Sequence, residues 1–240
     1  MTEVEHFVQK TDRHNNVLVS FKPSSQPLSM QSAEFELYSW NTPNGQKIII
    51  ALEEVCADYI YKPIDITQEE QHAESFRAVS PDEKIPVLVH HAAEPVILFE
   101  SGAILLYLAS QFPVLKSESD TTRANVMSWT FWQVGQLGPL AGQFGRFQIA
   151  IPPNPEAVKH FEALVWRCLD VMEKQLSRTT YLAGEQFSVA DIASFPWIAS
   201  QQSYLQRYHI TWREKCPALK SWADSIASRP SVIKALGLKE

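Results

Sequence analysis

Strand and helix patterns alternate through the first half of this 240-residue chain, whereas strand patterns almost vanish from the second half. Residues with apolar side chains at alternating or helical spacing identify the elements. They predict strands at 35–40, 59–64, 86–90 and 96–99, and helices at 46–55, 68–79 and 101–111. The resulting order, β-α-β-α-β-β-α, is that of a thioredoxin-like α/β domain.

The second half carries helical periodicity, with charged residues falling between apolar positions. It predicts helices at 121–136, 155–176, 189–206 and 217–227. We interpret the proline-containing stretch at 112–117 as the linker between the two halves. We therefore predict a thioredoxin-like domain at 34–113 and an all-α domain at 118–240. They follow an extension at 1–33 that is rich in turn-forming residues and has one short strand at 17–21.

Charge and cysteine content exclude several classes of function. A formal net charge of −6 argues against a broadly basic nucleic-acid-binding face. No apolar run is long enough to span a bilayer, and the first thirty residues lack the pattern of a secretory signal, so we expect a cytoplasmic protein. The three cysteines, Cys56, Cys168 and Cys216, form no Cys-x-x-Cys pair. They indicate neither a metal site nor an internal dithiol, so the reactive sulfur of any thiol chemistry must come from a ligand.

The turn Thr42-Pro-Asn-Gly45 joins the first predicted strand to the first predicted helix. Helix N-termini carry unpaired N–H groups and a partial positive charge. A thiol placed there is stabilised as the thiolate, and its pKa falls from about 8.5. Thr42 offers a hydroxyl donor and Asn44 an amide donor to such a sulfur. The alternative is that Thr42 only caps the helix and Asn44 only closes the turn, and the tetrapeptide alone favours that alternative.

A second strand–helix junction contains Glu100-Ser-Gly102. Ser101 can cap the helix and donate its hydroxyl, and the N–H groups behind it form an anion site suited to a carboxylate. Glu100 could pair with an ammonium group. Together these groups match the two charges of an α-amino acid terminus, although a plain helix cap explains the motif equally well.

A third motif, Ser188-Val-Ala-Asp191, precedes the apolar periodicity of 189–206. A serine at the N-cap with an acidic residue three positions later forms a capping box. Loss of such a cap typically costs about 1 kcal/mol. We therefore assign Asp191 to folding and not to catalysis.

Several segments together resemble the glutathione transferase superfamily. The most specific are Leu37-Tyr-Ser-Trp-Asn-Thr-Pro-Asn-Gly-Gln-Lys47 and Phe99-Glu-Ser-Gly-Ala-Ile-Leu-Leu-Tyr-Leu108, supported by 52–54, 80–86, 129–133, 138–143 and 188–193. The match covers approximately residues 34–236. It is closer to the nu class, the disulfide-bond-reductase-like bacterial and fungal members. The resemblance implies a thioredoxin-like domain that binds glutathione, an all-α domain, and a homodimer.

The resemblance also implies roles for individual residues. Thr42 and Asn44 are expected to face the glutathione sulfur, while Tyr38 is expected to be a core residue. Glu100 and Ser101 are expected to hold the γ-glutamyl end of the ligand.

Residues 84–86 and their neighbours are expected to complete the glutathione site. Pro86 should be the cis proline of the fold, which leaves the backbone of Ile85 to pair with the cysteinyl part. Lys84 and Gln71 should meet the other carboxylate. The family often has histidine before phenylalanine in the segment 142–147, where this chain has Arg146. Arg146 could bind a second carboxylate bidentately, or be a surface charge.

These expectations lead to one principal function and two alternatives. Members of this class can hold two glutathione molecules, or glutathione disulfide, in one site. One thiolate then attacks a disulfide and the second resolves the mixed disulfide, which predicts a glutathione-dependent disulfide-bond reductase with weak peroxidase or transferase activity. The first alternative is conventional conjugation of glutathione to electrophiles, in a second pocket formed by Trp129, Phe131, Trp132, Phe144 and Phe147, although most of these side chains suit a core. The second is a non-catalytic, regulatory glutathione-binding module.

Overall fold

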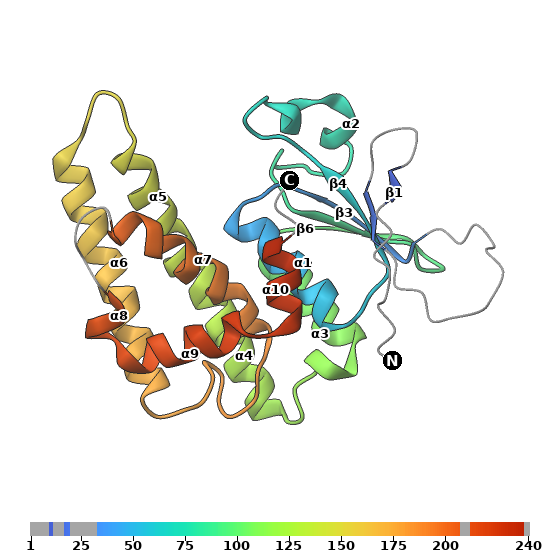
Figure 1. Cartoon of the computed structure of the whole chain (residues 1–240). Coiled ribbons are helices and arrows are strands. Elements are labelled where there is room, and N and C mark those ends of the chain that lie inside the picture. Colours follow the sequence, from blue (N-terminus) through green and yellow to red (C-terminus); the bar gives the residue numbers. More distant parts are fainter. Residues whose placement is uncertain (1–9, 12–16, 20–32, 207–211, 238–240) are drawn as a thin grey trace, which may run out of the picture.

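The computed structural model describes residues 10–11, 17–19, 33–206 and 212–237. Figure 1 shows a sheet on one side of the molecule and a group of helices on the other, with α1 and α10 between them. The predicted strand at 17–21 is present as β2 (Val17–Val19), and the rest of the predicted extension at 1–33 lies largely outside the described residues. Among the described residues, no helix combines the length and the apolar character that crossing a membrane requires.

Six strands form one mixed sheet in the order β1-β2-β4-β3-β5-β6. Strand β3 runs parallel to β4, and the other neighbouring pairs are antiparallel. The four strands expected in the thioredoxin-like region are all present, so the predicted α/β architecture of this half is confirmed. The strands are β1 (Lys10–Thr11), β2 (Val17–Val19), β3 (Phe35–Ser39), β4 (Tyr59–Pro63), β5 (Val87–His90) and β6 (Val96–Phe99).

Alternation along β3 decides which side chains enter the core. Phe35, Leu37 and Ser39 are fully buried, because successive residues of a strand point to opposite faces. Tyr38 is only half-buried, and its hydroxyl donates to Glu36 Oε2 at 3.0 Å. The prediction that Tyr38 is a core residue is therefore wrong, since the register of the strand buries Ser39 instead.

Helices α1 and α3 pack together beside the sheet, and a polar segment lies farther out. The polar helix predicted at 68–79 is divided in two, because the backbone of Ala73 is extended. The helical elements of this half are α1 (Pro43–Glu54), η1 (Glu70–His72), α2 (Glu74–Arg77) and α3 (Ser101–Gln111).

The second half of the described chain is helical, as predicted. The helix expected at 121–136 instead continues to Gln148 through a π-helical turn, η3. Pro139 has no N–H to donate and its ring excludes the carbonyl four residues earlier, which favours the wider turn. The elements are η2 (Pro113–Leu115), α4 (Asp120–Trp132), η3 (Gln133–Leu137), α5 (Gly138–Gln148), α6 (Pro155–Leu176), α7 (Val189–Gln206), α8 (Trp212–Lys215), α9 (Pro217–Ala227) and α10 (Pro230–Gly237).

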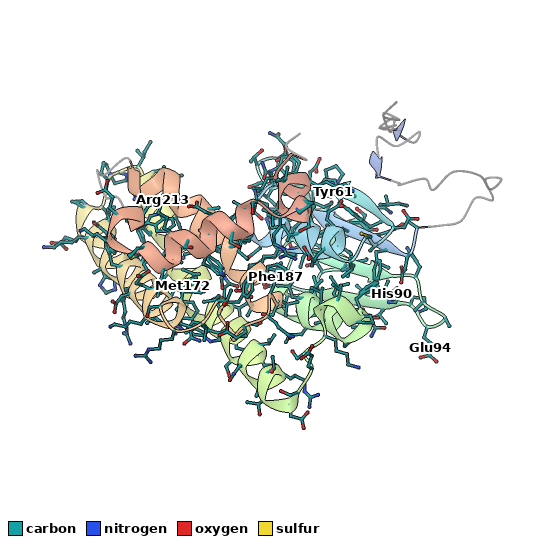
Figure 2. The ribbon with its side chains drawn as sticks, turned by 60° about the horizontal axis from the view of Figure 1, so that its bottom comes forward. Tyr61, His90, Glu94, Met172, Phe187 and Arg213 are labelled. Carbon is teal, nitrogen blue, oxygen red and sulfur yellow. The ribbon has the colours of Figure 1, made fainter. Side chains whose placement is uncertain are left out.

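One continuous apolar core joins the two halves. Figure 2 shows Met172 among the helices, Tyr61 and His90 at the sheet, and Phe187 between them. Helix α1 contacts both α7 and α10. The exact limits of 34–113 and 118–240 stay a prediction, because the core is shared across the boundary.

The N-terminus of α7 contains the predicted capping box. Asp191 is fully buried and accepts hydrogen bonds from the backbone N–H groups of Leu182 and Ser188, both at 3.0 Å. It also accepts from the Ser188 hydroxyl at 3.1 Å and from Trp222 Nε1 at 2.9 Å. Burial raises the pKa of Asp191 to about 6 although these hydrogen bonds oppose the shift. The contacts confirm the assignment of Asp191 to folding.

Candidate functional site

A cavity of about 250 Å³ lies where the N-termini of α1 and α3 meet the helical half. Figure 1 shows α1, α3, α4 and α7 converging in this part of the molecule. Both halves contribute to its wall, which is lined by Asn44, Lys47, Glu100, Ser101, Gln133, Val134, Gly138, Pro139, Gly142, Gln143 and Trp197.

The first wall is the N-terminus of α1. Thr42 is the N-cap, and its Oγ1 accepts a hydrogen bond from the backbone N–H of Gly45 at 3.2 Å. A Cβ atom at Gly45 would lie 2.2 Å from the carbonyl oxygen of Trp40, so only glycine fits this tight turn. The capping interpretation of Thr42 is therefore correct, and the hydroxyl hydrogen is still available for a ligand.

Asn44 does more than close the turn. It lines the cavity from the first turn of α1, and its Oδ1 accepts a hydrogen bond of 3.0 Å from Trp197 Nε1. The partner lies 153 residues away in the sequence, on α7. This contact ties the predicted thiol-facing turn to the helical half.

The second wall is the N-terminus of α3. Glu100 precedes the helix with a φ of +70°. Residues other than glycine rarely adopt such a positive φ, and those that do are concentrated at functional sites. It makes no side-chain capping bond, and Ser101 is the first residue of the helix instead of its cap. The backbone N–H groups of this terminus are therefore left without a side-chain cap.

Lys47 lies behind Ser101 and is almost completely buried. Its ammonium group donates to Ser101 Oγ at 3.2 Å and to Gln133 Oε1 at 2.6 Å. Burial lowers the pKa of Lys47 to about 7, although the negative charge of Glu100 opposes the shift. Because Ser101 Oγ accepts from Lys47, its own hydrogen can point to a ligand. Gln133 Nε2 is buried without a hydrogen-bond partner among the described residues.

Among the cavity residues that received no role from the sequence, three make hydrogen bonds at the site: Lys47, Gln133 and Trp197. Lys47 follows Asn44 by three positions, so helical spacing places both residues on one face of α1. This spacing could have indicated that Lys47 belongs to the same site as Asn44. Gln133 and Trp197 come from helices remote in the sequence. No local pattern distinguishes them from ordinary helix residues.

The structure brings Asn44, Glu100 and Ser101 together at the cavity, and Thr42 begins the same helix as Asn44. The other predicted site residues do not line the cavity: Thr42, Gln71, Lys84, Ile85, Pro86 and Arg146.

Each of these outer residues has a definite environment. The Ile85–Pro86 bond is cis, as predicted. Lys84 is exposed and pairs with Asp82 at 2.6 Å. Gln71 has a buried Oε1 without a partner among the described residues. Arg146 is exposed in the last turn of α5.

The aromatic pocket considered for electrophiles is not part of the cavity. Trp129 and Trp132 pack edge-on against one another with ring centroids 5.1 Å apart, and Phe144 is fully buried. Phe147 stacks on Phe161. Phe131 is exposed on α4 and does not belong to the core. Trp129, Trp132 and Phe144 therefore have the structural role expected of core residues.

Two family models match this chain. The model described as "Glutathione S-transferase, N-terminal domain" matches residues 33–110, and "Glutathione S-transferase, C-terminal domain" matches residues 140–230. The chain belongs to the glutathione S-transferase family. The predicted family and fold class are thereby confirmed.

This glutathione S-transferase has relatives of known name and structure. It is 40% identical over 209 residues to the disulfide-bond oxidoreductase YfcG of Escherichia coli strain K12, an alignment covering 84% of this chain and 94% of that protein. A Burkholderia graminis glutathione transferase with two glutathione molecules bound per subunit is 29% identical, with a TM-score of 0.82 over 88% of this chain and 91% of that one. The glutathione transferase YghU of Streptococcus pneumoniae ATCC 700669, complexed with glutathione, is 33% identical, with a TM-score of 0.80 over 89% and 86% of the two chains.

Proposed function

We propose that this glutathione S-transferase binds glutathione between α1 and α3 and uses its thiolate to reduce disulfide bonds. The observation that carries the proposal is the position of Asn44, in the first turn of α1 and on the wall of a cavity that also contains Glu100 and Ser101. The name of the E. coli relative and the glutathione-bound structures support the same assignment.

The α3 terminus suits the γ-glutamyl end of glutathione. Glu100 supplies a carboxylate for the ligand's ammonium group. Ser101 supplies a hydroxyl, and the uncapped N–H groups of α3 supply donors for the ligand's carboxylate. We infer that the backbone of Ile85, beside cis Pro86, pairs with the cysteinyl part.

The remaining carboxylates need cationic or amide partners. We assign the glycyl carboxylate to Lys84 and Gln71, because the Lys84 ammonium group is exposed and the amide Nε2 of Gln71 can donate to a carboxylate. If two glutathione molecules bind per site, as in the Burkholderia graminis protein, we assign a carboxylate of the second to Arg146. In the overall reaction, two glutathione thiols become glutathione disulfide and the substrate disulfide becomes two thiols.

The α1 terminus suits the sulfur. Its partial positive charge, the Thr42 hydroxyl and the Asn44 amide stabilise a thiolate and lower its pKa from about 8.5. The protein's own cysteines are poorly placed for this role. Cys168 and Cys216 are buried, and burial raises the pKa of Cys168 to about 11. Cys56 is exposed, but it follows the C-terminus of α1, the end of the helix opposite Asn44. The reactive sulfur therefore comes from bound glutathione.

We also infer a cytoplasmic homodimer. Cys56, Cys168 and Cys216 are all free thiols, which suits a reducing compartment. Apolar side chains are exposed on the edge strand β6, at Ile97 and Phe99, and on α4, at Met127 and Phe131. Large exposed apolar residues of this kind mark association surfaces. Sedimentation at micromolar concentration tests the inference, and a monomer would contradict it.

The deciding experiment compares wild type with Thr42→Ala in glutathione-dependent turnover of a model disulfide. Loss of a hydrogen bond to a charged sulfur predicts a fall in rate of about tenfold or more. Thr42→Ser is the matched control, because it keeps both the cap and the hydroxyl. Circular dichroism establishes that the variants are folded, since Thr42→Ala also removes the cap of α1. Equal rates of disulfide turnover for wild type and Thr42→Ala would contradict the proposed mechanism.

The same assay separates disulfide reduction from conjugation. The cavity is lined mainly by polar side chains and glycines, and the candidate aromatic residues lie elsewhere. This lining suits a peptide better than an apolar electrophile. Strong conjugation with negligible disulfide reduction would select the conventional transferase, and tight glutathione binding without turnover would select a non-catalytic module. A weak peroxidase activity stays a prediction.

A further inference from the structure

Trp197 lies against a glycine face of α5. A Cβ atom built at Gly138 would be 3.5 Å from Trp197 Cε2, and one built at Gly142 would be 3.5 Å from Cη2. The two glycines are four residues apart, so they share one face of the helix. A Cβ atom at either position would be in ordinary van der Waals contact with the ring, so the half-buried indole lies beside this face with room for one methyl group between its ring and the backbone of α5.

The indole also lies near the buried ammonium group of the site. Lys47 Nζ is 6.0 Å from the centroid of the Trp197 ring, a distance at which a cation is attracted to the ring face. Lys47 is itself held by Ser101 and Gln133. Trp197 thus has fixed neighbours on α5 and on α1, which hold its N–H group in one direction.

The contact with Asn44 determines the orientation of the asparagine amide. An indole N–H can only donate, so the atom that it meets at 3.0 Å must be the carbonyl oxygen Oδ1. The other end of the amide, Nδ2, then points away from Trp197 with two hydrogens to donate. Without the indole N–H, the Asn44 amide could rotate by half a turn. The acceptor Oδ1 would then take the place of the donor Nδ2.

We propose that Trp197 is a positioning residue that holds the Asn44 amide with its Nδ2 donor toward the thiolate of bound glutathione. This inference rests on the proposed function of the α1 terminus. A carbonyl oxygen facing the sulfur would oppose ionisation, whereas the amide N–H groups favour it. The helical half thereby influences the ionisation of a sulfur bound at the other half.

The test is Trp197→Phe, which keeps an aromatic ring on the glycine face and removes the N–H donor. Glutathione is the probe, and the readouts are the ultraviolet titration of its bound thiol and the pH dependence of disulfide turnover. We expect the bound thiol pKa and the acid limb of the pH profile to move up by about half to one unit. Turnover at neutral pH should fall about three- to tenfold, while the KM for glutathione stays within about twofold, because the γ-glutamyl contacts are untouched.

Trp222→Phe is the matched control. It makes the same substitution, and it also removes an indole hydrogen bond, here the one to the buried carboxylate of Asp191. Trp222 does not line the cavity. We expect Trp222→Phe to lower the melting temperature and to leave the thiol pKa at the wild-type value.

A second background separates positioning from packing. In Asn44→Ala, the amide is gone, so adding Trp197→Phe should produce no further shift in the thiol pKa. A shift of equal size in both backgrounds, or no shift when Trp197→Phe is made in the otherwise wild-type protein, would overturn the role of Trp197. If Asn44→Ala alone leaves the thiol pKa unchanged, the proposed function of the α1 terminus fails instead, so the two failures are distinguishable.

Discussion

Two helix N-termini in this protein begin with serine and are built in opposite ways. At α7, Ser188 is the cap, and the carboxylate of Asp191 accepts four hydrogen bonds. At α3, Ser101 is already inside the helix, and Glu100 precedes it with a positive φ and no capping bond. The α7 terminus is closed by its own chain, whereas the α3 terminus is open.

This difference separates a terminus that stabilises the fold from one that binds a ligand. At the closed terminus, the backbone N–H groups that the helix itself leaves unpaired donate to acceptors within the protein. These hydrogen bonds therefore stabilise the folded state. Donors at the open terminus can be used by a ligand carboxylate, and the strained backbone of Glu100 has no folding benefit that the structure shows. The predictions below test this contrast, in order of decreasing effect.

The largest effect is expected from Asp191→Ala at the closed terminus. The substitution leaves buried donors of Leu182, Ser188 and Trp222 without an acceptor, and each such loss costs about 1–3 kcal/mol. We expect the free energy of unfolding to fall by about 3–5 kcal/mol, measured by urea denaturation. Asp191→Asn, which keeps one acceptor oxygen, should lose less. A loss below about 1 kcal/mol for Asp191→Ala would contradict the comparison.

The next effect concerns Lys47 behind the open terminus. Its pKa of about 7 in the folded chain lies below the ordinary lysine pKa of 10.5. Between these values the unfolded chain binds more protons than the folded chain, so the contribution of Lys47 to stability rises with pH. Relative to Lys47→Met, the free energy of unfolding of wild type should increase by about 2 kcal/mol from pH 7.5 to pH 9. A flat or falling difference would exclude a buried, titrating ammonium group.

Ser101→Ala tests the open terminus itself. We expect about a tenfold loss of glutathione affinity by isothermal titration calorimetry, because a hydrogen bond to a charged ligand group is removed. The free energy of unfolding should fall by about 1–2 kcal/mol, less than for Asp191→Ala, because the buried ammonium group of Lys47 loses one acceptor and keeps Gln133 Oε1. Ser110→Ala is the control, since Ser110 is exposed near the other end of α3 and donates only to the Tyr107 carbonyl. If Ser101→Ala destabilises the fold as strongly as Asp191→Ala, the two termini do not differ as described.

The smallest effect on stability is expected from Lys84→Ala. Lys84 forms an exposed ion pair with Asp82, and such pairs contribute about 0–1 kcal/mol. We expect a change in unfolding free energy within about 0.5 kcal/mol, and a loss of glutathione affinity that becomes smaller as salt is added. If Lys84→Ala binds glutathione as tightly as wild type at low salt, Lys84 does not contact the ligand.

Local sequence patterns predicted much of the fold and part of the site. The helices at 155–176, 189–206 and 217–227 have the predicted bounds, because long apolar periodicity identifies them. Asn44, Glu100 and Ser101 were found because they lie in short motifs at element junctions, and the structure brings them to one cavity.

The remainder depends on contacts between distant segments. Helix α5 was missed because Gly138, Gly142 and Gly145 are poor helix formers. Glycine is favoured at position 138 only in the folded structure, where a Cβ atom would lie 2.9 Å from Gln133 Nε2. Gln133 and Trp197 are ordinary helix residues until the two halves meet. Tyr38 was misplaced because alternation alone does not say which face of a strand is buried.

The π-helical turn η3 determines how α5 is presented to the site. The backbone N–H of Gly138 bonds to the carbonyl of Gln133, five residues earlier, so the turn contains one residue more than an α-helix would. Deleting Gly135 would restore the ordinary count and rotate every later side chain of α5 by about 100°. The glycine face of α5 would then turn away from the indole of Trp197. Substitutions within η3 are therefore expected to be tolerated more often than insertions or deletions.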